Sequence, residues 1–292
     1  MNMRKIYIIR AITLIVIGLI FHSTCSLYAQ NTVAMPFAAK PADASSAGKA
    51  GISFTDTPLL SGRTLDISAG YMLWSPTYVP VSNVNISATY CLAGKISFSI
   101  DGMYGIGNDY GQMNIGLGAG YRMTDFLAAR INLRYLSENL TPEVSYGALG
   151  ADVAVDCLLP ISDNGKIAAE LGVFSVGSKV TSASGIKYSL PSSAKIGVGY
   201  IHDIDNRNSI KVLAEADYYF HNAIGAALGA EAKIADIISV RAGYRYGAKY
   251  ILPSFASVGV GAKFAGIKID AAYLFANEVI GNTTAISVGY CF

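Results

Sequence analysis

Apolar and polar residues alternate along most of the chain from Thr64 to the C-terminus. The first run has Leu65, Ile67, Ala69, Tyr71 and Leu73 on one parity and Asp66, Ser68 and Gly70 on the other. Alternation over about ten residues, bounded by turn residues, is typical of a membrane-spanning β-strand with one lipid-facing side. The pattern predicts an all-β fold: a transmembrane antiparallel barrel, residues 64–292, of about fourteen strands. We place the strands at 64–73, 84–92, 96–101, 114–122, 130–135, 148–158, 166–174, 193–201, 209–219, 223–234, 237–247, 255–264, 267–275 and 283–292.

Charged residues in these runs all share the parity opposite to the large apolar side chains. A charge on the lipid side would cost about 2–4 kcal/mol at the bilayer centre, so this parity is expected to face the lumen. A soluble β-sandwich would also alternate, but its solvent side should be rich in Lys and Glu, and here it is rich in Gly, Ser and Ala. The charged residues are Asp66, Asp101, Arg122, Arg130, Arg134, Asp152, Asp156, Glu170, Lys195, Lys211, Glu215, Asp217, Glu231, Lys233, Arg241, Arg245, Lys263, Lys268 and Asp270.

Tyrosines and the C-terminal residues support the same interpretation. Aromatic residues on the lipid parity near strand ends form girdles at the two membrane interfaces. The C-terminal residues Ile286, Val288, Tyr290 and Phe292 alternate on the lipid parity and are similar to the signal that the outer-membrane barrel-assembly machinery recognises. We therefore expect that machinery and outer-membrane lipid as partners. The tyrosines on the lipid parity are Tyr71, Tyr90, Tyr121, Tyr135, Tyr200, Tyr218, Tyr244, Tyr246, Tyr273 and Tyr290.

The composition and the N-terminal residues indicate that the protein is exported. The 292-residue chain has only 14% charged residues, against about 25% in a typical soluble protein. Arg4, Lys5 and Arg10 precede a short apolar stretch, residues 11–21, and Ala29 is a suitable cleavage position, so residues 1–29 are predicted to be a cleaved signal peptide. Lipidation at Cys25 is the alternative, which His22 disfavours. No later apolar run is long enough for a spanning helix.

The remaining chemistry-bearing residues do not indicate an enzyme, a cofactor or a metal site. Cys91, Cys157 and Cys291 are odd in number and lie in separate strand-like runs. His202 and His221 are expected on turns at opposite ends of the barrel, with no nucleophile beside a base. Removing the signal peptide leaves 19 basic and 20 acidic residues, which gives no indication of nucleic-acid binding.

The lumen-facing charges have two interpretations. Arg130, Arg134, Arg241 and Arg245 are expected either to form a basic wall that selects anions or to pair with Glu215, Asp217 and Glu231. The basic and acidic residues on this parity are nearly equal in number, which favours pairing and a narrow or filled lumen over a wide aqueous pore. We expect the first strand to start, and the last to end, on the periplasmic side, with the longest external loop at 175–192.

The segment before the first strand carries a family resemblance. Residues 42–51, ADASSAGKAG, resemble the small-residue opening of the long-chain fatty-acid transporter (FadL-like) superfamily, and in particular its Bacteroidetes branch, the PorV/PorQ family. Asp56-Thr57-Pro58-Leu59 stands where that family has an Asn-Pro-Ala turn, so the match departs from the pattern there. The resemblance implies that residues 30–63 plug the lumen, with Asp43, Gly48, Gly51 and Pro58 as the plug residues.

The resemblance leaves the function open. One possibility is passive transport of a hydrophobic or small solute; another is an accessory role in type IX secretion, binding cargo or partner proteins. A structural barrel or porin is a third. A transporter of hydrophobic solutes predicts an apolar groove at the outer mouth, for which Tyr78, Val79, Ile251 and Leu252 are candidates. The short external loops argue against the secretion role.

Overall fold

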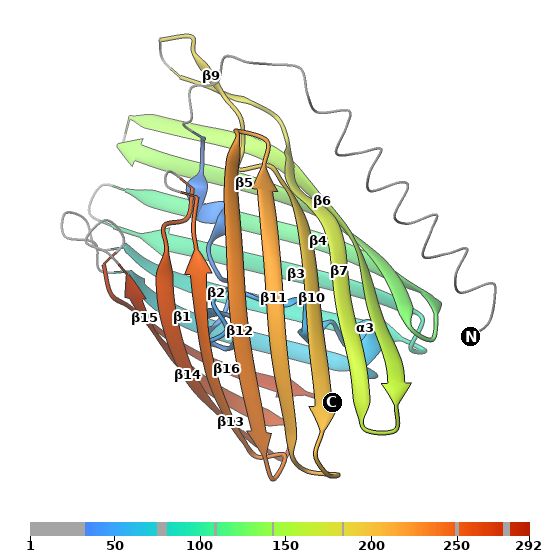
Figure 1. Ribbon diagram of the computed structural model, residues 1–292. Helices are drawn as coiled ribbons and strands as arrows, with labels where there is room; N and C mark the ends of the chain where they lie inside the picture. The colour runs from blue at the N-terminus through green and yellow to red at the C-terminus, as the bar shows by residue number, and fades with distance from the viewer. Residues whose placement is uncertain are drawn as a thin grey trace. The chain divides into compact units, whose positions relative to one another are not determined.

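The computed structural model describes residues 33–74, 81–107, 110–141, 143–182, 184–248, 251–276 and 281–292. The predicted signal peptide, Tyr78 and Val79 lie outside these residues. Fourteen antiparallel strands form one closed barrel, in which β1 pairs with both β2 and β16 (Figure 1). The barrel strands are β1 (Leu65–Trp74), β2 (Val81–Leu92), β3 (Ile96–Ile106), β4 (Gly111–Thr124), β5 (Leu127–Thr141), β6 (Val144–Ser162), β7 (Gly165–Gly177), β10 (Ser193–Asp203), β11 (Ser209–Tyr219), β12 (Ala223–Ile234), β13 (Ile238–Tyr246), β14 (Phe255–Phe264), β15 (Ile267–Ala276) and β16 (Thr283–Cys291).

The predicted fold class is confirmed, and each predicted run corresponds to one barrel strand. Several strands are longer than their apolar alternation. β5 was expected at 130–135 and extends over Leu127–Thr141, because backbone pairing with β6 continues past Tyr135 where the side chains become polar. A small hairpin of β8 (Val180–Thr181) and β9 (Lys187–Tyr188) lies in the segment expected to be a plain loop. Two residues per strand are too few to show alternation.

The outer face of the barrel is apolar. Mid-strand side chains such as Ile86, Leu117 and Leu228 are about 60% exposed, at 60%, 62% and 63%. An apolar surface that surrounds a barrel needs lipid rather than water around it. The charged side chains of the strands lie on the opposite parity, and several, including Asp156 and Glu170, are buried inside. Within the described part of the chain, no helix is long and apolar enough to cross a membrane.

A charge placed on the outer face should destabilise the barrel. Leu117 lies in the middle of β4 and is 62% exposed on the outer side. Leu117→Arg is expected to lower the free energy of unfolding in lipid vesicles by about 2–4 kcal/mol, because the guanidinium must enter hydrocarbon. Urea unfolding in vesicles measures the change. Leu117→Ala is the control for lost side-chain volume, and equal stability of the two variants would argue against a lipid-facing position.

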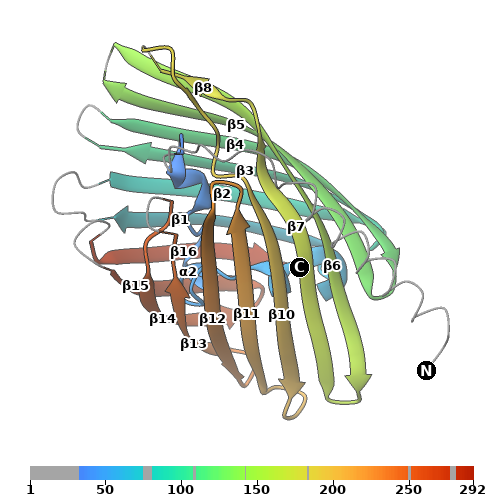
Figure 2. The ribbon, with the colours of Figure 1, turned by 45° about the horizontal axis from the view of Figure 1, so that its top comes forward.

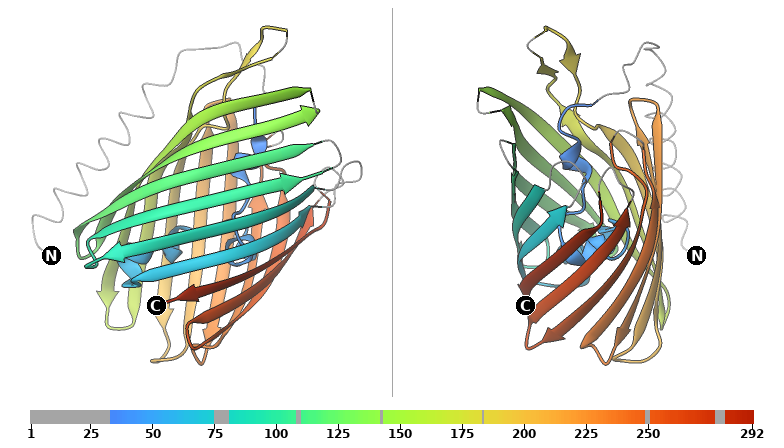
Figure 3. Two further views of the ribbon diagram at one scale, coloured as in Figure 1. Left: turned by 180° about the vertical axis from the view of Figure 1, so that it is seen from behind. Right: turned by 90° about the vertical axis from the view of Figure 1, so that its left-hand side faces the viewer.

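The described chain before β1 lies within the barrel (Figures 2 and 3). This lumen segment, residues 33–63, forms four one-turn helices and contacts β14–β16 through α2, β7 through η2 and β2–β5 through α3. Short helices joined by small residues allow the chain to follow the lumen without a core of its own. The helices are η1 (Pro36–Ala39), α2 (Ala44–Ala47), η2 (Phe54–Asp56) and α3 (Pro58–Ser61).

The lumen segment passes from one end of the barrel to the other. We call the end where Leu65 begins and Cys291 finishes the turn end, since the tight turns there, such as Ala93-Gly94 and Ala265-Gly266, have positive φ at both residues. The opposite end is the loop end. Val33 packs there against Tyr219 and Ile251, whereas α3 lies at the turn end beside Cys91 and Ala128. The first barrel strand therefore begins, and the last one finishes, at the turn end, whereas residue 33 lies at the loop end.

Candidate functional site

The lumen segment approaches β12, β13 and β14 at backbone distance. A Cβ added to Gly243 would lie 2.7 Å from the Ala50 nitrogen, and one added to Gly259 would lie 3.1 Å from the Gly48 Cα. Between them, Ser257 Oγ accepts a hydrogen bond from Ala50 N (3.1 Å) and donates one to Gly48 O (3.2 Å). Small residues on both sides thus allow the backbone of the lumen segment to contact the barrel wall. We call this part of the wall, formed by Gly243, Ser257 and Gly259, the seat.

Filling the seat should displace the lumen segment. Gly243→Ala places a methyl group against the Ala50 backbone, so we expect a loss of about 1–3 kcal/mol in stability and looser packing of the segment. Thermal unfolding and protease sensitivity of the segment in folded protein measure both effects. Gly225→Ala is the matched control, because its Cβ meets nothing nearer than 3.4 Å. Equal behaviour of the two variants would show that the seat does not hold the segment.

The predicted plug residues lie at the ends of the short helices of the lumen segment and at a turn between them. Asp43 caps α2, its carboxylate accepting a hydrogen bond from Ser46 N at 2.7 Å. Gly48 follows α2 at its C-terminus, and Gly51 has φ +85°, a conformation that a side chain would strain. Pro58 is the first residue of α3, where its missing N–H costs no helix hydrogen bond.

Arg245, one of the predicted lumen arginines, anchors the wall behind the segment. Arg245 is 4% exposed and donates to Ala50 O (2.7 Å), to Asp217 (2.8 Å) and to Glu215 (2.6 Å). Lys195 lies 3.4 Å from Glu215 and 3.6 Å from Asp217. Arg245 therefore joins two strands of the wall to the backbone of the lumen segment.

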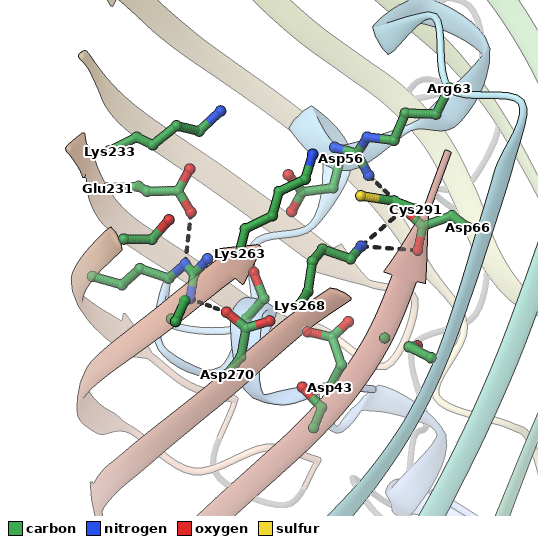
Figure 4. A pocket seen from close by; sticks show the side chains of 18 of the residues that line it. Asp43, Asp56, Arg63, Asp66, Glu231, Lys233, Lys263, Lys268, Asp270 and Cys291 are labelled. Atoms are coloured by element: carbon green, nitrogen blue, oxygen red, sulfur yellow. Dashed lines mark hydrogen bonds and ion pairs between the residues drawn. The ribbon is translucent and has the colours of Figure 1, made fainter. Parts of the chain in front are cut away.

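A second group of ion pairs, around Glu231, includes charged residues of the lumen segment itself (Figure 4). Arg241 donates to Glu231 and Asp270, both at 2.6 Å. Lys49, which is fully buried, donates to Asp56 at 2.6 Å and lies 4.0 Å from Glu231. The ammonium group of Lys211 lies 3.7 Å from the Asp56 carboxylate, which therefore has two cationic neighbours.

The remaining two arginines pair with partners that the sequence did not indicate. Arg130 pairs with Asp156 at 2.8 Å and also with Glu170, and Arg134 lies 3.5 Å from Asp152. All four lumen arginines thus have carboxylate partners, so they do not form a free basic wall. Glu215, Asp217 and Glu231 pair with Arg245 and Arg241 but not with Arg130 or Arg134.

Among the described residues, two cavities lie between the lumen segment and the barrel wall. The larger, about 400 Å³, is bounded by β1–β6, η2 and α3, and the smaller, about 270 Å³, lies toward the turn end. They share lining residues, among them Asp56, Ser68 and Thr89, so they are adjacent. The smaller one reaches Asp236 beside a turn, and its lining includes Lys233 and Lys263, which Figure 4 labels.

Among the described residues, a buried layer of side chains crosses the lumen toward the loop end. Asn83, Gln112 and Leu136 are all buried. Each lies two residues nearer the loop end than a cavity-lining residue of its own strand, namely Asn85, Asn114 and Arg134. Above them Met35 and Phe37 of the lumen segment pack with Leu136, Ala148, Val180 and Leu190. The cavities therefore end beneath a layer that the lumen segment completes.

The expected apolar groove at the outer mouth is not formed by its described candidates. Ile251 is buried with Val33, Tyr219 and Ala248, and Leu252 is buried beside Phe255 in the main apolar cluster. Ile251 shares its cluster with Val33 of the lumen segment, and Leu252 shares its cluster with Ala50 and Ile52 of the same segment. That prediction was wrong for these two residues.

Comparisons with known proteins support the fold. No protein-family model and no curated protein matches the chain. A solved structure titled "TodX deltaS2S3 mutant monoaromatic hydrocarbon channel" is 11% identical, with a TM-score of 0.52 over 86% of this chain and 97% of that chain. The toluene transporter TodX of P. putida (11% identity, TM-score 0.49, 87% and 97% coverage) and the Acinetobacter baumannii outer membrane protein Omp33 (12%, 0.49, 79% and 98%) are less similar in shape. At such identities the likeness establishes a shared barrel fold and no more.

Proposed function

We propose that this protein is a passive outer-membrane transporter of small solutes, of the FadL-like kind, with residues 33–63 as a lumen plug. The observation that carries the proposal is a partly filled lumen. Adjacent cavities extend from the turn end to mid-barrel and stop beneath a layer that Met35 and Phe37 complete. A purely structural barrel has no need of such an internal path, and an open porin would not be closed at one end.

The neighbours in fold support a transport role rather than another one. The solved structure with a TM-score of 0.52 to this chain is described as a monoaromatic hydrocarbon channel. The type IX secretion alternative has no comparable support: the longest described connection carries only the short β8–β9 hairpin, part of which packs on the lumen segment. That leaves little loop surface for a folded cargo protein.

Reconstitution tests the proposal directly. The purified mature chain in liposomes should admit small solutes at a protein-dependent rate, and in planar bilayers it should show low conductance because the lumen is mostly filled. Heat-modifiable migration on gels confirms that the reconstituted protein is a folded barrel. A folded protein that leaves liposomes impermeable to every small solute, polar and apolar, would contradict a transport function.

A further inference from the structure

The barrel wall facing the larger cavity is lined by hydroxyl and amide side chains. They come from β2–β5: Asn85, Thr89, Ser97, Ser99, Asn114 and Asn132. The glycines of β4 make room for them. A Cβ on Gly116 would collide with the Asp101 carboxylate, and one on Gly118 would collide with Ser99 Oγ. Polar side chains of β3 therefore lie across β4, which gives this wall a dense set of hydrogen-bonding groups.

Two amides on this wall keep an unmet acceptor. Asn114 is 6% exposed, and its Oδ1 accepts no hydrogen bond from the described residues. Asn132 donates through Nδ2 to Asp101 Oδ1 at 3.2 Å, while its own Oδ1 is likewise unmet among those residues. A buried acceptor without a donor is unfavourable, because it has lost its hydrogen bond to water. Both residues line the cavity, so a hydroxyl-bearing occupant would supply the missing donors.

The charges around the path are balanced. Eight basic and eight acidic residues line the two cavities taken together. Many are already paired, such as Lys268 with Asp66 at 2.9 Å and Lys211 with Glu231 at 2.8 Å. The larger cavity alone is lined by two basic and four acidic residues, so an anion gains no net attraction there. Each of the four carboxylates already has a partner within the protein, which weakens the attraction for a cation; these carboxylates belong to Asp43, Asp56, Asp101 and Asp152. An apolar solute would have to cover the hydrogen-bonding wall without replacing its bonds to water, which is unfavourable.

We propose that the larger cavity binds a neutral polyhydroxylated solute of about monosaccharide size, with Thr89, Asn114 and Asn132 as hydrogen-bonding partners. This inference rests on the proposed transport function and names its substrate class. The volume of about 400 Å³ is in the lower part of the range found for small-molecule sites. Pro58 and Leu59 of the lumen segment line the same cavity and offer an apolar surface to the C–H groups of a sugar ring.

Uptake into liposomes by the full mature chain tests the substrate class. The probes are glucose, gluconate as a charged compound of similar size, and toluene. We expect saturable glucose uptake that is faster than gluconate or toluene uptake. In Thr89→Val/Asn114→Leu the half-saturation concentration for glucose should rise about tenfold, since two hydrogen bonds are lost. Thr284→Val is the matched control, because Thr284 is exposed on the other parity of β16.

The outcomes separate this inference from the proposed function. Faster uptake of toluene or gluconate than of glucose would overturn the substrate class and leave a transporter. An unchanged half-saturation concentration in the double variant, with the folded state verified by heat-modifiable migration, would overturn the assignment of the cavity. Protein-dependent uptake of none of the three probes would overturn the transport function, and this inference with it.

Discussion

Replacing Arg245 with Met should destabilise the protein and loosen its lumen segment. The guanidinium is 4% exposed and holds Glu215, Asp217 and the Ala50 carbonyl oxygen at 2.6–2.8 Å. Removing it leaves two buried carboxylates whose one remaining cationic partner among the described residues is Lys195, at 3.4 and 3.6 Å. Breaking a buried pair of this kind costs about 3–5 kcal/mol. Urea unfolding in vesicles measures the stability, and bilayer conductance, which should rise, measures the loosening.

A second substitution separates lost charge balance from lost packing. Arg245→Met with Glu215→Gln removes one carboxylate and leaves Asp217 paired with Lys195, so we expect it to recover much of the stability of Arg245→Met. The conductance should stay raised, because the hydrogen bond to Ala50 O is still missing. Arg207→Met, in an exposed turn, is the control for removal of one positive charge. A double variant as unstable as Arg245→Met would show that the cost is not electrostatic.

The barrel could be predicted from the sequence because its side-chain period is local. Each strand contains enough apolar residues on one parity to fix which side faces lipid, and charges such as Glu231 and Arg241 then fall inside. Their pairing follows from the three-residue turn at 235–237, which sets Ile234 opposite Ile238 and therefore Glu231 opposite Arg241. The strand ends were less well predicted, since pairing extends beyond the apolar band.

The candidate site could not be predicted in the same way. Glycine alternates along β4 at Gly116 and Gly118, and along β14 at Gly259 and Gly261, with nothing in the pattern to distinguish the two. In the structure, Gly259 receives the backbone of the lumen segment, whereas the β4 glycines receive polar side chains from β3. The path of the lumen segment determines which part of the barrel wall contacts the segment and which part faces the larger cavity. Helices of four residues carry no periodicity that would reveal that path.

The buried ion pairs of the lumen segment were missed for a related reason. In the sequence, Lys49 and Asp56 belong to the segments compared with the family motif, and nothing there pairs them. In the structure Lys49 is fully buried and the two side chains are 2.6 Å apart. A lone lysine in a stretch of small residues, seven positions before an aspartate, is a weak signal by itself. It gains meaning once Glu231 is known to lie 4.0 Å from the Lys49 ammonium.

Removing the lumen segment should give the largest change in transport. No barrel strand pairs with residues 34–57, so their deletion leaves the strand ladder between β1 and its neighbours β2 and β16 intact. The variant should fold, because the C-terminal residues and all described strands remain. Single-channel conductance should rise at least severalfold, and discrimination between glucose and gluconate should fall, since one boundary of the cavity is gone.

The matched control replaces the same residues with a Gly/Ser sequence of equal length. A chain of that composition behaves as a flexible coil and lacks the seat contacts of Gly48 and Ala50 and the ion pair of Lys49 with Asp56. If the native segment closes the lumen by its specific contacts, the replacement should conduct nearly as well as the deletion. If chain volume alone closes the lumen, the replacement should conduct like the wild type. The second result would contradict a seated plug, even with both variants correctly folded.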